Sequence, residues 1–120
     1  MNYRANHDTH YQHNRDDSHT RTDYIRTIYF ESNNFSIDFH PREYDYNIMK
    51  QFVTDFISNK DCKIELFDDT SIDFIVDQET VTVKLDWQTR PGTLIYKSSR
   101  GEWVDAFKKL SDDMEQYVFR

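Results

Sequence analysis

The sequence predicts an α+β domain in which a mostly antiparallel sheet packs against two amphipathic helices. Two periodicities support this prediction. Several short runs alternate apolar and polar residues, as strands with one buried face do. Two longer runs repeat apolar residues every three or four positions, as helices with one buried face do. The predicted order is ββα-ββββ-α, a two-layer sandwich with a sheet of about five to six strands and both helices on one face.

The predicted strands are rich in β-branched and aromatic residues and are separated by turn residues. The first two form a hairpin because Asn33 and Asn34 favour a turn between them. The later ones are separated by short turns, which predicts an antiparallel meander. The expected strands are residues 24–30, 35–39, 62–67, 71–76, 80–87 and 93–97.

Each predicted helix carries one apolar stripe. Pro41 is suited to the first turn of a helix of about 16 residues. Its stripe consists of Ile48, Met49, Phe52, Val53, Phe56 and Ile57. The second helix follows Ser99 and carries Trp103, Phe107, Leu110, Met114 and Tyr117.

Residues 1–23 differ in composition from the rest of the chain. They contain no Ile, Leu, Val or Phe, and are dominated by His, Asp, Asn, Arg, Thr and Ser. Such a segment buries too little apolar surface to offset the entropy lost on ordering. We therefore predict a disordered polar tail over residues 1–23 and a single α+β domain over residues 24–120.

Charge and cysteine content restrict the classes of partner and compartment. The net charge of −7 disfavours direct binding to nucleic acid, which needs clustered Lys and Arg, and suits a protein partner with a basic surface. Cys62 is the only cysteine, so we expect a small buried side chain rather than a disulfide. We find no run of 18 apolar residues and no secretory leader pattern, so we expect no membrane contact and a cytoplasmic protein.

The common catalytic motifs are missing from the sequence. The chain has two glycines, nine residues apart, so it lacks a glycine-rich phosphate loop. It also lacks the G-x-S-x-G motif of serine hydrolases and the H-E-x-x-H motif of zinc proteases. We therefore expect a protein that is not an enzyme and uses no cofactor.

The histidines of the tail are weak candidates for metal ligands. His7, His10 and His13 lie among aspartates, and imidazole and carboxylate both bind zinc, nickel or copper. Steps of three residues would spread these side chains around a helix. The alternative is a solvated tail that contains several histidines, and we expect no metal.

The polar face of the predicted sheet is the candidate partner-binding surface. Carboxylates arrayed on a rigid sheet can imitate a phosphate backbone and occupy a basic groove. Apolar side chains among them could serve as anchors. The alternative is an ordinary polar face in which lysines neutralise the carboxylates. The candidate residues are Asp38, Glu65, Phe67, Asp68, Asp69, Asp73, Asp86 and Trp87.

These features predict a small, acidic, non-enzymatic binding protein. In composition it is similar to inhibitors encoded by phages and mobile elements, and it would block a basic surface on a nucleic-acid-handling protein. The alternative is a structural or assembly subunit, in a virion or a homo-oligomer, whose tail orders on docking and whose sheet edge is extended by strand addition.

Overall fold

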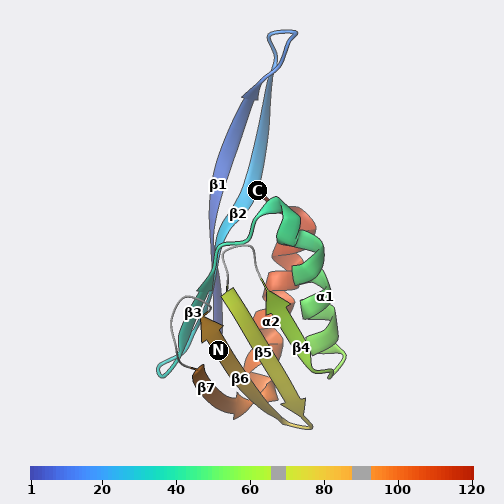
Figure 1. Cartoon of the computed structure of the whole chain (residues 1–120). Coiled ribbons are helices and arrows are strands. Elements are labelled where there is room, and N and C mark those ends of the chain that lie inside the picture. Colours follow the sequence, from blue (N-terminus) through green and yellow to red (C-terminus); the bar gives the residue numbers. More distant parts are fainter. Residues whose placement is uncertain (66–69, 88–92) are drawn as a thin grey trace.

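The computed structural model describes residues 1–65, 70–87 and 93–120, with only the backbone described at positions 70, 86, 87 and 93 (Figure 1). The described residues confirm the predicted α+β class. The strands are β1 (Asn2–His13), β2 (His19–Glu31), β3 (Ser36–Phe39), β4 (Cys62–Glu65), β5 (Thr70–Asp77), β6 (Thr80–Trp87), β7 (Thr93–Ser99) and β8 (Val118–Phe119). The helices are α1 (Tyr46–Ile57), preceded by a short 3-10 turn at Glu43–Asp45, and α2 (Arg100–Gln116).

The strands form two sheets, where the sequence predicts one. Sheet A has the order β1-β2-β3, and β8 pairs in parallel with β2. Sheet B is the antiparallel meander β4-β5-β6-β7 that the turns predict. The single-sheet prediction was wrong. Among the described strands β3 pairs with β2 and not with β4, so the chain leaves sheet A after β3, passes through α1 and starts a new sheet at Cys62.

Residues 1–23 are not a disordered tail in the structure. Twelve of them form β1, which pairs antiparallel with β2 from Asn2 opposite Glu31 to His13 opposite His19. Pairing with β2 satisfies the backbone hydrogen-bonding groups on one side of β1, so the segment needs few aliphatic side chains to be ordered. At its first residues, Tyr3 and Ala5 are half-buried against the core.

The distal part of the β1–β2 hairpin projects from the rest of the molecule (Figure 1). We call residues 8–23 the arm and the remaining described residues the body. The molecule measures 54 × 31 × 25 Å, with the arm extending its long dimension. The arm ends in a turn in which the Asn14 amide donates to the Ser18 carbonyl at 2.8 Å, and Asp17 adopts a φ of 65°.

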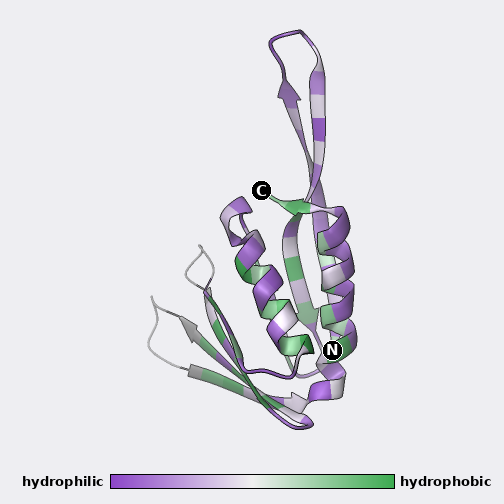
Figure 2. Cartoon of the chain, turned by 90° about the vertical axis from the view of Figure 1, so that its right-hand side faces the viewer, coloured by the Kyte–Doolittle hydropathy of each residue, from purple (hydrophilic) through white to green (hydrophobic). Residues whose placement is uncertain are grey.

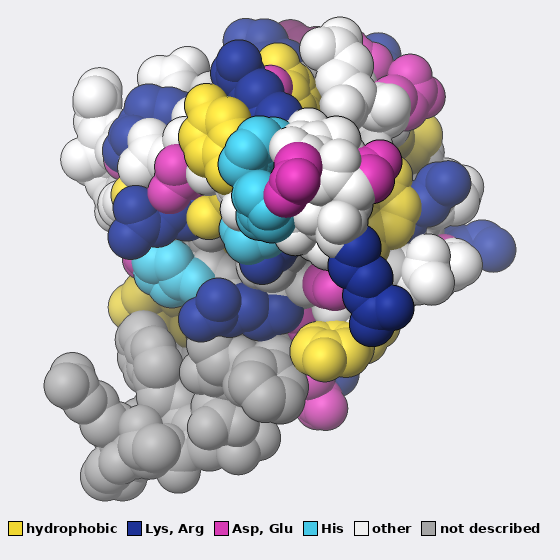
Figure 3. Space-filling model, turned by 90° about the horizontal axis from the view of Figure 1, so that it is seen from above, with side chains coloured by type: hydrophobic (Ala, Val, Ile, Leu, Met, Phe, Trp, Pro, Cys, Tyr) yellow, Lys and Arg dark blue, Asp and Glu magenta, His cyan; other side chains and the backbone are white. Residues whose placement is uncertain are grey.

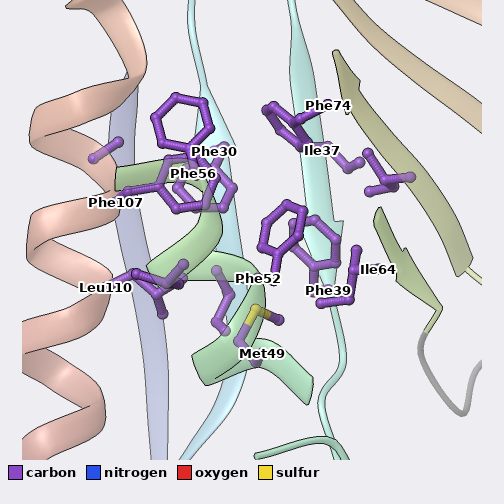
Figure 4. Packing of buried hydrophobic residues seen from close by; sticks show 14 of the residues in the cluster. Phe30, Ile37, Phe39, Met49, Phe52, Phe56, Ile64, Phe74, Phe107 and Leu110 are labelled. Carbon is purple, nitrogen blue, oxygen red and sulfur yellow. The ribbon is translucent and has the colours of Figure 1, made fainter. Parts of the chain in front are cut away.

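The core of the body is a cluster of aromatic rings from both helices and both sheets (Figure 4). Phe107 of α2 lies 5.2 Å from Phe30 of β2 and 5.6 Å from Phe74 of β5, measured between ring centroids. Phe107 also stacks on Phe56 of α1 at 4.2 Å. The helices therefore join the two sheets through one core, and their apolar faces are turned inward (Figure 2).

The predicted helix stripes are largely confirmed. In α1, Met49 and the three apolar residues that follow it on the same face are buried. Ile48 and Ile57, which the spacing included, are 46 % and 41 % exposed. In α2, four predicted residues are buried, while Tyr117 follows the helix and is half-buried. The first helix is also shorter than the predicted 16 residues: α1 has 12 residues, because a 3-10 turn at Glu43–Asp45 separates it from Pro41.

Candidate functional site

The structure divides the predicted acidic surface between the two sheets. Glu65 lies on β4 and Asp73 on β5, so both belong to sheet B. Asp38 lies on β3, in sheet A. The expected single face that would carry Asp38 beside Glu65 and Asp73 is therefore not formed.

The carboxylates described on these sheets have cationic neighbours. Asp73 is directly opposite Lys63 on one side and Lys84 on the other. The Lys63 Nζ atom lies 3.2 Å from the Glu65 Oε1 atom. Cross-strand pairs of this kind reduce the negative potential of a sheet face, which weakens the argument for a phosphate-like carboxylate array.

The other predicted partner-binding residues are only partly described. Phe67, Asp68 and Asp69 lie outside the described residues. Asp86 and Trp87 end β6, where their backbones pair with Ser71 and Thr70, and their side chains lie outside the described part. The structure thus gives Trp87 a strand partner that the sequence did not indicate.

The sheet B face also exposes two isoleucines. Ile75 of β5 is 38 % exposed and Ile95 of β7 is 54 % exposed. Ile95 is opposite Lys84, and Ile75 is opposite Thr82. The sequence carries a signal for Ile95, because it alternates with Leu94 and Tyr96 in the predicted strand of residues 93–97.

The tail histidines do not converge. Successive side chains of a strand point to opposite faces, so His10 faces away from His7 and His13. His7 lies against Tyr117, with ring centroids 4.5 Å apart, while His13 lies 4.7 Å from the ring of His19 at the tip. Among the described residues, no group of three His, Cys, Asp or Glu side chains has the geometry of a metal site.

Viewed from above, the end of the molecule that carries the arm shows interleaved histidine, basic and acidic side chains (Figure 3). Asp23 illustrates how these groups pair. Its carboxylate accepts a hydrogen bond from the Thr9 hydroxyl at 2.7 Å and from Arg21 at 3.2 Å, and these bonds lower its pKa. The arm is thus cross-linked by polar pairs rather than by apolar packing.

Cys62 is a buried structural side chain. It is 6 % exposed, at the start of β4. Burial and, to a smaller extent, the nearby carboxylates of Asp55, Asp61 and Asp73 together raise the pKa of its thiol to about 12. The thiolate is therefore scarce near neutral pH, which agrees with the predicted unreactive role.

The long outer edge of β1 is the feature that sequence reasoning missed. β1 is the terminal strand of sheet A, and no described strand pairs with its second edge. Proteins usually protect such edges with lysine, proline or a very short strand. β1 has 12 residues, contains neither lysine nor proline, and carries Arg4 and Asp8 as its charged side chains besides three histidines.

The base of the hairpin is held firmly by α2. The Tyr3 hydroxyl donates a hydrogen bond to Asp113, and the His7 Nε2 atom lies 3.9 Å from the same carboxylate. Burial and the adjacent Asp113 carboxylate raise the pKa of Tyr3 above its usual range. These contacts hold the first half of β1 in place against α2.

No family model matches the chain, and no curated protein or solved structure is significantly similar to it. Within the described residues, neither helix is long and apolar enough to cross a membrane. Function must therefore be argued from the geometry of the chain itself.

Proposed function

We propose that this chain is a non-enzymatic assembly subunit that pairs with a second copy of itself along β1. The observation that carries this proposal is the outer edge of a 12-residue strand, with which no strand of the described part of the chain pairs. Along that edge every second residue directs both its N–H and its C=O group outward, and β-strand addition would satisfy these groups.

A second copy suits this edge better than an arbitrary partner. Two β1 strands have the same length and can pair antiparallel about a two-fold axis, so that each copy contributes the same surface. Sheet A would then continue from one molecule into the next. The exposed Tyr11 ring, which is 65 % accessible, would gain a cross-strand neighbour from the second copy.

The test compares two pairs of lysine substitutions at the same level of the hairpin. His10→Lys with Gln12→Lys places two charges on β1. Thr22→Lys with Thr20→Lys places the same charges on β2, because these residues are the direct partners of His10 and Gln12. Lysine side chains on an edge strand disfavour its pairing with another strand, so the β1 variant should dimerise about tenfold more weakly, or about 1.4 kcal/mol.

The readout is light scattering coupled to size-exclusion chromatography, from dilute to concentrated protein. The wild-type chain should pass from monomer to dimer, and the β2 variant should follow it closely. A wild-type chain that stays monomeric throughout would contradict the proposal. So would equal weakening by both pairs of substitutions.

A second candidate is the predicted inhibitor that blocks a basic surface of a nucleic-acid-handling protein. The observation that favours it is the distribution of charge: residues 1–23 contain three Arg and four Asp, so six of the seven net negative charges belong to residues 24–120. A basic partner would then dock on the body, leaving the arm free. With its single cysteine, such a protein suits the reducing cytoplasm.

A lysine-rich peptide serves as the probe for this second candidate. Binding should weaken steeply as salt is added, since exposed charges are screened. Asp38→Lys and Asp73→Lys should each weaken it, whereas Asp16→Lys in the turn of the arm is the matched control. Binding that ignores salt, or equal effects of all three substitutions, would count against docking on the body.

A further inference from the structure

A cationic hollow lies where the arm joins the body, although the protein is acidic overall. Its volume is about 430 Å³. It is lined by Tyr24, Arg26, His40, Pro41, Arg42 and Arg120. Three arginines from three separate segments therefore surround one space in a chain of net charge −7.

An irregularity in β2 places the first of these arginines. In the pairing with β1, Asn6 is opposite Thr27 and His7 is opposite Ile25, so Arg26 is an extra residue without a partner. Such a β-bulge changes the direction of a side chain and is often found beside functional sites. On the other edge of β2, β8 ends opposite Ile25 and β3 ends opposite Ile28, so no described strand pairs with that edge at Arg26. That edge is therefore open at Arg26.

The segment after β3 crosses this opening. The His40 Nδ1 atom lies 3.4 Å from the hydroxyl of buried Thr27, and its Nε2 atom lies 2.9 Å from Asp38. These contacts hold the chain that carries Arg42. The Arg42 amide donates to the Asp45 carboxylate at 2.8 Å, which fixes the backbone at that position.

Two carboxylates are described beside the lining residues of the hollow: Asp38 pairs with His40, and Asp8 lies near a guanidinium group. The ion pair described for the three guanidinium groups is between Arg26 Nη1 and Asp8 Oδ2, and its length is 3.9 Å. That distance is longer than a hydrogen bond, so the guanidinium keeps its donors available. A bound anion could therefore accept hydrogen bonds from several arginines at once.

We propose that this hollow binds the phosphate group of a small phosphorylated molecule. Arginine forks match the tetrahedral oxygens of phosphate, and they bind it better than a single ammonium does. The ligand is small because the acidic body repels a polyanion with many phosphates, while one phosphate meets only the local positive charge. The site lies on the β3 and β8 side of β2. Pairing of two molecules along β1, on the opposite side of β2, would therefore leave the site uncovered.

The same chemistry could come from free phosphate or from a nucleotide. Tyr24 distinguishes the two sources, because it is the aromatic residue of the hollow and could stack on a base. Removal of this ring with Tyr24→Ala should weaken the binding of a mononucleotide if the base is bound. It should leave the affinity for inorganic phosphate and pyrophosphate unchanged.

The experiment titrates the full chain by NMR with inorganic phosphate, pyrophosphate, adenosine monophosphate and a short single-stranded oligonucleotide. Arg26→Gln and Arg42→Gln remove charge from two separate segments of the hollow. Arg21→Gln is the matched control, since Arg21 lies on the same strand as Arg26 and pairs with Asp23 at 3.2 Å. Thermal melting establishes that each variant folds.

Each hollow variant should bind the phosphate probes at least about tenfold more weakly, and the Arg21 variant should bind them as the wild type does. If Arg26→Gln does not fold, Arg42→Gln in the loop still decides the question. Three results would overturn the proposal: no binding of any small probe, equal weakening by Arg21→Gln, or an oligonucleotide bound more tightly than the mononucleotide.

Discussion

The arm and the body of this molecule are ordered by different forces. The arm has no buried residue, and its strands are joined by backbone pairing and exposed polar contacts. The body holds a continuous core of aromatic and aliphatic side chains. In Figure 2 the arm is mainly hydrophilic, whereas apolar residues line the inner sides of the helices and strands below it.

This contrast shows that part of a sheet can be ordered by backbone pairing even where its side chains are not buried. β2 belongs to both regions, because its first residues form the arm and its last residues lie in the core. An isolated two-stranded hairpin is marginally stable in water. The arm therefore depends on the body as its foundation, while the body should depend little on the arm.

The largest expected effect comes from the ring that joins both sheets. Phe107→Ala removes contacts with Phe30, Phe56 and Phe74 together. We expect the free energy of unfolding to fall by about 3–5 kcal/mol, because a large cavity is left in the core. Tyr11→Ala on the arm is the control and should change it by less than about 0.5 kcal/mol. Chemical denaturation measures both, and similar losses would break the distinction between the regions.

A smaller effect is expected where the hairpin is attached to α2. Tyr3→Phe removes the hydrogen bond to Asp113 while keeping the ring against Phe30. The loss should be about 1–2 kcal/mol, since hydrogen bonds to charged groups exceed neutral ones. Amide hydrogen exchange should also become faster in β1. An unchanged exchange rate would show that this contact does not hold the base of the hairpin.

The response to pH should also come from the body. The pKa of Cys62 is raised from 9.0 to about 12 in the folded protein. The unfolded thiol loses its proton first, so the contribution to stability is complete below pH 9 and is lost as pH rises toward about 12. The free energy of unfolding should fall by about 1 kcal/mol between pH 8 and pH 10.5, after allowance for residual solvent screening. The raised pKa of Tyr3 adds to this loss as pH rises above 10, the ordinary pKa of a tyrosine.

The matched variant for this pH response is Cys62→Ala. It should be less stable at pH 8 because it leaves a small cavity, but its stability should decline less steeply with pH. Urea denaturation at several pH values measures both quantities. Parallel declines in the two proteins would mean that the thiol does not cause the effect.

The smallest effect on stability is expected from shortening the arm. Replacement of residues 9–23 by Asn-Gly would join Asp8 to Tyr24, which are cross-strand partners, through a tight turn. Because the removed residues bury no core side chain, the free energy of unfolding should change by less than about 1 kcal/mol. A shortened chain that fails to fold would show that the arm supports the body.

Much of the body was predictable because its strands and helices bury one face. The apolar period of α2 identified Trp103 and Phe107, and the alternation in residues 80–87 identified Val81 and Val83, all of which are buried. Of the candidate site, the sequence indicated the charged residues but not their grouping. Asp38 and Asp73 both occupy polar positions in alternating strands, and the residues around them do not indicate that the two strands belong to different sheets.

The sequence by itself determined the α+β class, the order of elements from residue 24 to the end of α2 and most of the core, since burial of one face leaves a period along the chain. It gave no sign of β8. Only the tertiary structure decided that residues 2–13 form a strand, because their order comes from pairing with β2 and not from their own apolar content. It also decided that the strands divide into two sheets. The hollow around Arg26 depends on a bulge and on three distant segments, so no local pattern of residues could have indicated it.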